Sequence, residues 1–173
     1  MAINRDQIIS LLETPQPADL GPGPRAGDLS VAQIEAGIAD IPVTARELVR
    51  ALVLLWHDHL DESHRVAQEI KNADGSFIHA IMHRREPDYS NAKYWWHRVG
   101  DHPAFPEIAA RVDRLLKERG VGELAKQLLP GGKWDACAFV DACENASAED
   151  QPVLREIQRI ETEVLLERFT SAD

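Results

Sequence analysis

Apolar residues recur every three or four positions along most of the chain, which is the period of an α-helix with one buried face. The clearest example runs from about Asp150 to Phe169, where the spacing alternates between four and three. Its apolar positions are Val153, Ile157, Ile160 and Val164. No segment alternates apolar and polar residues over five or more positions, as a half-buried strand would. The pattern therefore predicts an all-α protein.

Proline, glycine and capping residues set the ends of the predicted helices. Pro87 ends a helix that starts near Phe77, because proline disfavours the helical conformation of the residue before it. Ser90 begins the next helix, which ends at Gly100. The apolar pattern from Thr44 to about Ile70 predicts one long helix before these two.

The N-terminal part of the chain has a different composition. Residues 14–28 hold four of the ten prolines and three of the ten glycines, which predicts a loop or an extended arm. The whole chain, residues 1–173, is then a single compact bundle of about seven or eight helices. Its last helix packs on its own core or forms the seam of a homodimer.

Composition and charge exclude several classes of protein. The 173 residues are 44% apolar and 28% charged, as in ordinary globular domains. The formal net charge of −10 argues against nucleic acid and anionic membranes as main partners, because both are polyanions. No apolar run approaches the ~20 residues of a membrane span, and we see no signal peptide, so we expect a cytoplasmic protein. Cys137 and Cys143 are six residues apart on a predicted helix and are not expected to form a disulfide.

All seven histidines lie between His57 and His102, together with most of the aromatic residues. Clustered histidine, tryptophan, tyrosine and arginine are the side chains that line polar pockets. The alternative is that this region is only the best-packed part of the bundle. All the candidate metal-binding, catalytic and ligand-binding residues lie in this region.

Two groups of three residues have the spacing of metal ligands on a helix. His79, His83 and Glu86 are at positions i, i+4 and i+7. Two imidazoles one turn apart and a carboxylate can hold a divalent transition metal such as zinc, nickel, iron or manganese, with a position left for water. The long helix repeats the spacing in a second set of ligands: His57, Asp61 and His64.

A predicted turn at residues 72–76 would bring the two helices back alongside each other, but the sequence does not fix whether the two groups face one another. Without a metal, the histidines can act as general acid and base near neutral pH. The candidate catalytic residues are His79, His83, His57 and His64.

Polar and aromatic residues that follow the His-x-x-x-His pair are candidates for binding the anionic group of a small molecule. They are Arg84, Arg85, Asn91, Tyr94, Trp95 and Arg98. The alternative for Arg84 and Arg85 is that they pair with acidic residues and hold the loop in place.

The run HAIMHRREPDYSNAKYWWHRVGDHP, with WHDHLDESH upstream, resembles a family of small bacterial and fungal helical proteins. The resemblance implies no activity for any residue. The order of one histidine followed by a His-x-x-x-His pair is also similar to the helical-bundle metalloenzymes of the DinB type. The gap between them is shorter here, so that likeness is an analogy of residue order.

These observations lead to two main hypotheses about function. The first is a small-ligand site in residues 57–102 that uses a metal or histidine acid/base chemistry on an anionic small molecule. The second is a non-catalytic interaction or structural protein, dimeric through the C-terminal helix, whose polar cluster is an internal hydrogen-bond network. Nucleic-acid binding through the arginines and tryptophans is a third hypothesis, which the net charge disfavours.

Overall fold

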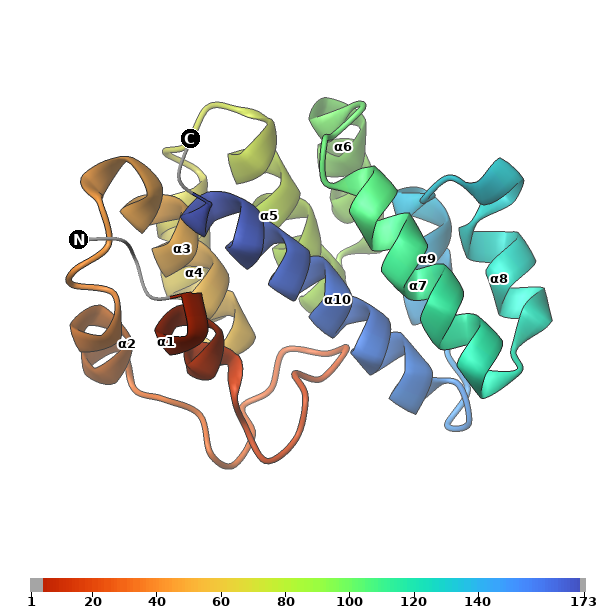
Figure 1. The fold of residues 1–173 in the computed structure, drawn as a ribbon, viewed down its shortest axis with the longest axis horizontal. Helices are drawn as coiled ribbons and strands as arrows, with labels where there is room; N and C mark the ends of the chain where they lie inside the picture. The colour runs from red at the N-terminus through yellow and green to blue at the C-terminus, as the bar shows by residue number, and fades with distance from the viewer. Residues whose placement is uncertain (1–4, 172–173) are drawn as a thin grey trace.

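The computed structural model describes residues 5–171, except the side chains of Arg5, Val43 and Thr44. Within this range the chain is all-α, as predicted, and contains no strand. It forms ten α-helices instead of seven or eight, in part because the predicted long helix is divided (Figure 1). The helices are α1 (Arg5–Ile9), α2 (Val31–Gly37), α3 (Val43–Trp56), α4 (Leu60–Ala67), α5 (Ala73–Arg85), α6 (Tyr89–Val99), α7 (Phe105–Arg119), α8 (Gly122–Leu128), α9 (Ala136–Glu144) and α10 (Gln151–Thr170). Two short 3-10 helices, η1 (Ser10–Leu12) and η2 (Pro130–Gly132), complete the described secondary structure.

Helix α10 lies across the molecule in Figure 1 and packs against α1, α3, α7 and α9. Half of its twenty residues are buried. The apolar positions Val153, Ile157 and Val164 are among them, whereas Ile160 is half-buried. Most of the apolar positions expected from the sequence therefore pack within the same chain. This packing leaves little apolar surface on α10 for contact with a second copy.

The predicted continuous helix from Thr44 to Ile70 is wrong, because the chain leaves helical geometry between α3 and α4. Asp58 has φ 63°, the left-handed conformation that aspartate tolerates better than most residues. Its buried carboxylate accepts hydrogen bonds from Arg25 at 2.8 Å and from Arg85 at 2.5 Å. Two guanidinium groups from distant parts of the chain thus hold the break, and the local apolar pattern carries no sign of it.

The predicted turn at residues 72–76 is also displaced. Asn72 caps α5 by accepting a hydrogen bond from the Gly75 amide at 2.9 Å, so these residues form the first turn of that helix. A side chain at Gly75 would meet the Ile70 carbonyl oxygen at 2.3 Å, which explains the glycine. The connection between α4 and α5 is residues 68–72.

Residues 13–30 contain no helix and run along the lower edge of the molecule in Figure 1. Buried polar side chains hold this segment, which we call the arm. Arg85 donates to the Gly21 carbonyl at 3.1 Å, and Gln158 of α10 donates to the Ala18 carbonyl at 3.2 Å. The arm is therefore packed onto the bundle through hydrogen bonds to its backbone.

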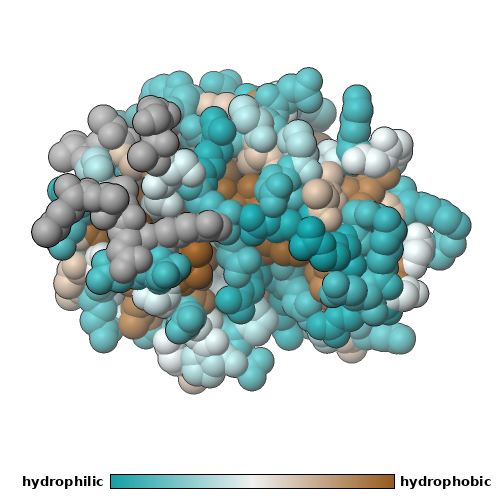
Figure 2. Space-filling view, in the orientation of Figure 1, coloured by the Kyte–Doolittle hydropathy of each residue, from teal (hydrophilic) through white to brown (hydrophobic). Residues whose placement is uncertain are grey.

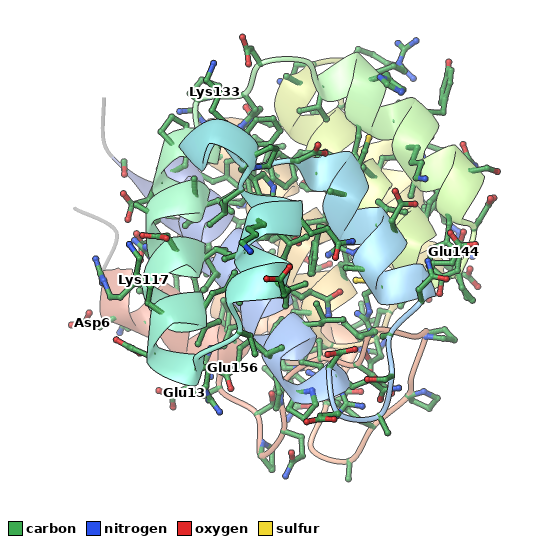
Figure 3. The ribbon with its side chains drawn as sticks, turned by 90° about the vertical axis from the view of Figure 1, so that its right-hand side faces the viewer. Asp6, Glu13, Lys117, Lys133, Glu144 and Glu156 are labelled. Atoms are coloured by element: carbon green, nitrogen blue, oxygen red, sulfur yellow. The ribbon has the colours of Figure 1, made fainter. Side chains whose placement is uncertain are left out.

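Hydrophilic residues are prominent on the surface of the molecule (Figure 2). Figure 2 shows hydrophilic residues over much of one face, with hydrophobic side chains between them. At the end formed by α7, α8 and α9, the labelled Lys117, Glu144 and Glu156 lie at the periphery (Figure 3). Among the described residues, no helix combines the length and apolar character that a membrane crossing requires. Cys137 and Cys143 are both free thiols, as predicted.

Candidate metal centre

Three histidines from two consecutive helices form one cluster. His64 comes from the middle of α4, and His79 and His83 lie one turn apart on α5. Each offers a ring nitrogen, and these three atoms lie within 4.8 Å of one another. His79 and His83 are buried and His64 is half-buried, so the cluster meets solvent on the His64 side.

Aromatic contacts fix the ring of His79. It stacks on the Trp95 indole of α6, with ring centroids 3.9 Å apart and planes 15° from parallel. It also stacks on His83 at 4.9 Å and meets the edge of His64 at 4.7 Å. Helix α6, which packs closely on α5, thus places one wall of the cluster.

Burial lowers the pKa of His79 to about 3, and the neighbouring His83, His64 and Lys71 charges act in the same direction. His79 is therefore neutral at physiological pH, with a lone pair available for a metal. Across residues 5–171 the side chains of His64 and His79 make no hydrogen bond to the protein. The fully buried polar atoms that lack a partner belong to other residues, so these ring nitrogens are not sealed in the core and are accessible to a metal.

The surroundings of His83 are polar. Its Nδ1 lies 3.0 Å from a Glu86 carboxylate oxygen, and the Asn91 side-chain amide nitrogen lies 3.2 Å from its Nε2. Burial lowers the pKa of His83, while the Glu86 charge opposes that effect. The structure thus places Glu86, predicted as a third ligand, beside His83 and not in the three-residue group, which contains His64 in its place. A carboxylate on one imidazole nitrogen is the usual way to orient a metal-binding histidine.

The three nitrogens fit a transition metal after small side-chain movements. A tetrahedral zinc site has Zn–N distances of about 2.0–2.1 Å, which separates ligand nitrogens by about 3.4 Å. The limit of 4.8 Å is larger, so the rings must close by an ångström or so on binding. Three histidines also leave one coordination position for water or for a substrate oxygen.

The other members of the predicted second ligand set lie elsewhere. His57 is buried between the arm and α3, with its Nε2 at 2.6 Å from the Leu11 carbonyl oxygen and its Nδ1 accepting from the Leu29 amide at 3.1 Å. Asp61 is exposed on α4. Only His64 of that set joins the cluster, because the break at Asp58 turns His57 away from it.

The two adjacent arginines, predicted as ligand-binding residues, are fully buried and paired. Arg84 makes two hydrogen bonds to Glu161 of α10, at 2.6 and 3.2 Å, and packs over the Phe139 ring. Arg85 binds Asp58, the Leu55 carbonyl and the Gly21 carbonyl. These contacts match the alternative interpretation of Arg84 and Arg85, in which the two arginines pair with acidic residues and hold chain segments together.

The remaining predicted ligand-binding residues lie on α6 beside the cluster. Asn91 reaches His83, and Trp95 stacks on His79. Arg98 lies over the Trp95 ring, with Cζ at 5.3 Å from its centroid, and donates to the Tyr94 hydroxyl at 3.4 Å. These four residues therefore lie in a row that leads outward from the histidines.

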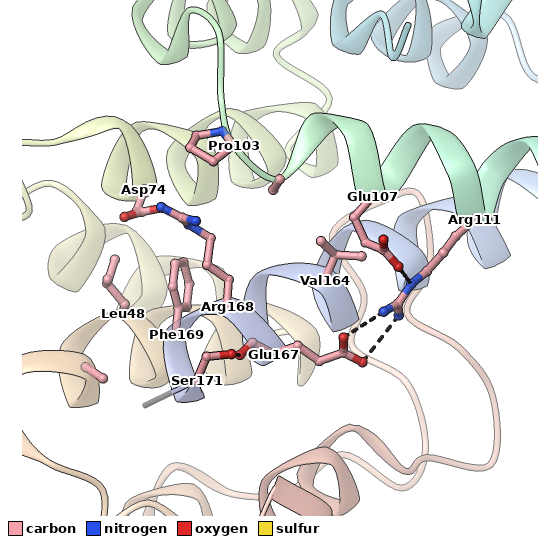
Figure 4. Close-up of a pocket in the computed structure, with 12 residues that line it drawn as sticks. Leu48, Asp74, Pro103, Glu107, Arg111, Val164, Glu167, Arg168, Phe169 and Ser171 are labelled. Atoms are coloured by element: carbon pink, nitrogen blue, oxygen red, sulfur yellow. Dashed lines mark hydrogen bonds and ion pairs between the residues drawn. The ribbon is translucent and has the colours of Figure 1, made fainter. Parts of the chain in front are cut away.

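Two of the cavities outside the cluster are the most extensive of those found, and neither was expected from the sequence. One, of about 1040 Å³, is lined mainly by apolar residues of α7, α8 and the segment around Trp134. The other, of about 710 Å³, lies between α7 and the end of α10 (Figure 4). Arg111 pairs there with Glu107 and Glu167, and Arg168 lies 3.5 Å from Asp74, so these charges are mutually compensated. Neither cavity brings together a group of potential metal ligands among the described residues.

Comparison of the chain with protein-family models, with curated proteins and with solved structures gives no match. The resemblance of the chain to a family of small helical proteins therefore stays a prediction.

Proposed function

We propose that His64, His79 and His83 bind one divalent transition metal ion and that the protein acts on a small molecule there. The observation that carries this proposal is the convergence of three imidazole nitrogens within 4.8 Å. The neutral state of His79, the absence of protein hydrogen bonds to His64 and His79 within residues 5–171, and the Glu86 carboxylate on His83 support it. Zinc, nickel, iron and manganese are all compatible with imidazole ligands.

The chemistry that fits this site is hydrolysis or hydration by a metal-activated water. A zinc ion with three histidine ligands lowers the pKa of its water to about 7, which supplies a nucleophile at neutral pH. The opening on the His64 side gives that position access to solvent. Glu86 is close enough to His83 Nδ1 to orient the ring, and the Asn91 amide has to move away from Nε2 before that nitrogen can bind a metal.

The second hypothesis, an internal hydrogen-bond network, is favoured for a different subset of the predicted residues. His57, Arg84 and Arg85 each have protein partners in the structure. His102 likewise contacts Asp74 at 2.9 Å through Nε2 and accepts from the Ala104 amide. A structural role for these four residues is compatible with a metal at His64, His79 and His83.

Elemental analysis of protein purified without a His tag tests the proposal. We expect about one equivalent of metal in the wild type and a large loss in His79→Ala/His83→Ala. His97→Ala is the matched control, because His97 is an exposed histidine of α6 outside the cluster. If the double variant unfolds, His64→Ala is the second test, since His64 is only half-buried. Wild-type protein that takes up no zinc, nickel, iron or manganese on titration would contradict the proposal.

A further inference from the structure

The strongest remaining feature is an uncompensated cation next to the histidine cluster. Most arginines in the described part of this acidic protein contact a carboxylate, including the exposed Arg119 and the half-buried Arg159. Arg98 is exposed and forms no ion pair within residues 5–171. Among the described residues, its partners are the Tyr94 hydroxyl and the rings of Tyr94 and Trp95.

Trp95 connects this cation to the cluster. The indole centroid lies 3.9 Å from that of His79 and 5.3 Å from the Arg98 Cζ. Those two separations place the guanidinium carbon no more than about 9 Å from the centre of the His79 ring. Trp95 contacts both groups, so a ligand that joins a metal at the cluster to the Arg98 guanidinium would run along the indole.

The aromatic neighbours also favour ligand binding at this position. Tyr94 is 55% exposed and is the one large hydrophobic residue classed as exposed in the described part of the chain. Exposed tyrosine next to tryptophan and arginine is the composition typical of binding surfaces. The Lys71 ammonium, which is among the charges that lower the pKa of His79, adds positive potential near the cluster.

We propose that the metal-loaded protein binds small dianions, with one anionic group on the metal at His64, His79 and His83 and the other on the Arg98 guanidinium. The guanidinium fork suits a carboxylate or a phosphate as the second group. This inference rests on the proposed metal site and identifies its substrate class as short molecules with two anionic ends.

Cobalt-loaded protein allows the inference and the metal site to be tested separately. Cobalt affinity is measured first, for wild type, Arg98→Gln and the control Arg114→Gln. Arg114 is exposed on α7 and also lacks an ion pair in the described range. Acetate, succinate and 3-phosphonopropionate are then titrated while the visible cobalt spectrum is recorded. Acetate can occupy only the metal, whereas the other two can also reach Arg98.

We expect equal cobalt affinity in the three proteins and tighter binding of at least one dianion than of acetate by wild type. Arg98→Gln should weaken that dianion about tenfold while acetate binding changes little, because only the charge-assisted hydrogen bond to the second anionic group is lost. The dianion that shows the effect identifies the second group as carboxylate or phosphate. Equal dianion binding by wild type and Arg98→Gln, no preference over acetate, or the same loss in Arg114→Gln would overturn the inference while leaving the metal site intact. Failure of wild type to bind cobalt would overturn both.

Discussion

His57 and His79 are both buried, but the partners of their ring nitrogens differ. His57 uses both nitrogens to hold the backbone at Leu11 and Leu29, whereas His79 has ring contacts and no protein hydrogen bond. The same residue type thus has a structural role at one position and a candidate ligand role at the other. Neighbours distant in sequence determine which role each residue has.

The buried His57 predicts a pH dependence of stability. Burial lowers its pKa below the unfolded value of about 6.5, so the unfolded chain takes up a proton first as the pH falls. The free energy of unfolding should therefore fall below about pH 6.5, by at most about 1.4 kcal/mol per pH unit from this residue, until the folded pKa is reached. His57→Gln should lose less stability than wild type between about pH 7 and about pH 5.

Urea denaturation in the presence of EDTA measures this difference without interference from metal. His59→Gln is the control, because His59 is only partly buried and contacts one carbonyl of the arm. An unchanged pH dependence in His57→Gln would show that this imidazole does not stay neutral in the folded protein.

Ion pairs between helices act at the next scale. Arg84 of α5 and Glu161 of α10 are completely buried and bind each other through two hydrogen bonds. Burial raises the pKa of Glu161, and the Arg84 charge opposes that rise. Removing one partner leaves an uncompensated charge in the core, which is more costly than losing the pair as a whole.

Arg84→Met should therefore lower the free energy of unfolding by about 3–5 kcal/mol, and adding Glu161→Met should restore most of the loss. Lys117→Met, which removes an exposed ion pair with Asp113 on α7, should change stability little. Chemical denaturation of the four proteins measures these effects. A double variant as unstable as Arg84→Met would mean that the guanidinium acts through its packing on Phe139 instead of its charge.

Helix ends were predictable where local chemistry decides them. The end of α6 at Gly100 and the bounds of α10 lie within a residue of the sequence expectation, whereas the start of α6 is capped by Asp88 and not by Ser90. The break at Asp58 was not predictable, because Arg25 and Arg85 hold it from far away in the chain. Local sequence signals therefore located helix ends but not a tertiary break.

In the candidate site, too, local spacing predicted one part and distant contacts determine the other. The spacing of His79 and His83 on one helix was sufficient to pair them, since a single turn fixes that geometry. The position of His64, the third residue of the cluster, depends on how α4 packs against α5. The spacing of residues within either helix does not predict that packing. Glu86 was the nearest carboxylate in sequence, but His64 is the residue that the packing brings to the cluster.

At the scale of the whole molecule, α10 acts as a central element of one chain. Its buried face contacts helices from both ends of the sequence, α1 and α9 among them. The arm is bound to it as well, through Gln158 and through Arg155, which pairs with Asp19 at 3.0 Å. Much of the core would be exposed without this helix.

Deletion of residues 150–173 should therefore abolish cooperative unfolding and expose apolar surface, detected by circular dichroism and by dye binding. Under the dimer hypothesis, the same deletion would give a folded monomer from a dimeric parent. Sedimentation of both proteins distinguishes the two outcomes, and a folded truncated monomer would contradict the role assigned here to α10.

The contacts between the arm and α10 have a consequence for synthesis on the ribosome. Ala18 and Asp19 leave the exit tunnel early, but Gln158, which binds their carbonyl groups, is translated about 140 residues later. At about 5–20 residues per second, the arm must wait several seconds or longer for its partner. These contacts therefore form only after α10 has been translated, and the arm reaches its final packing only when that helix has emerged.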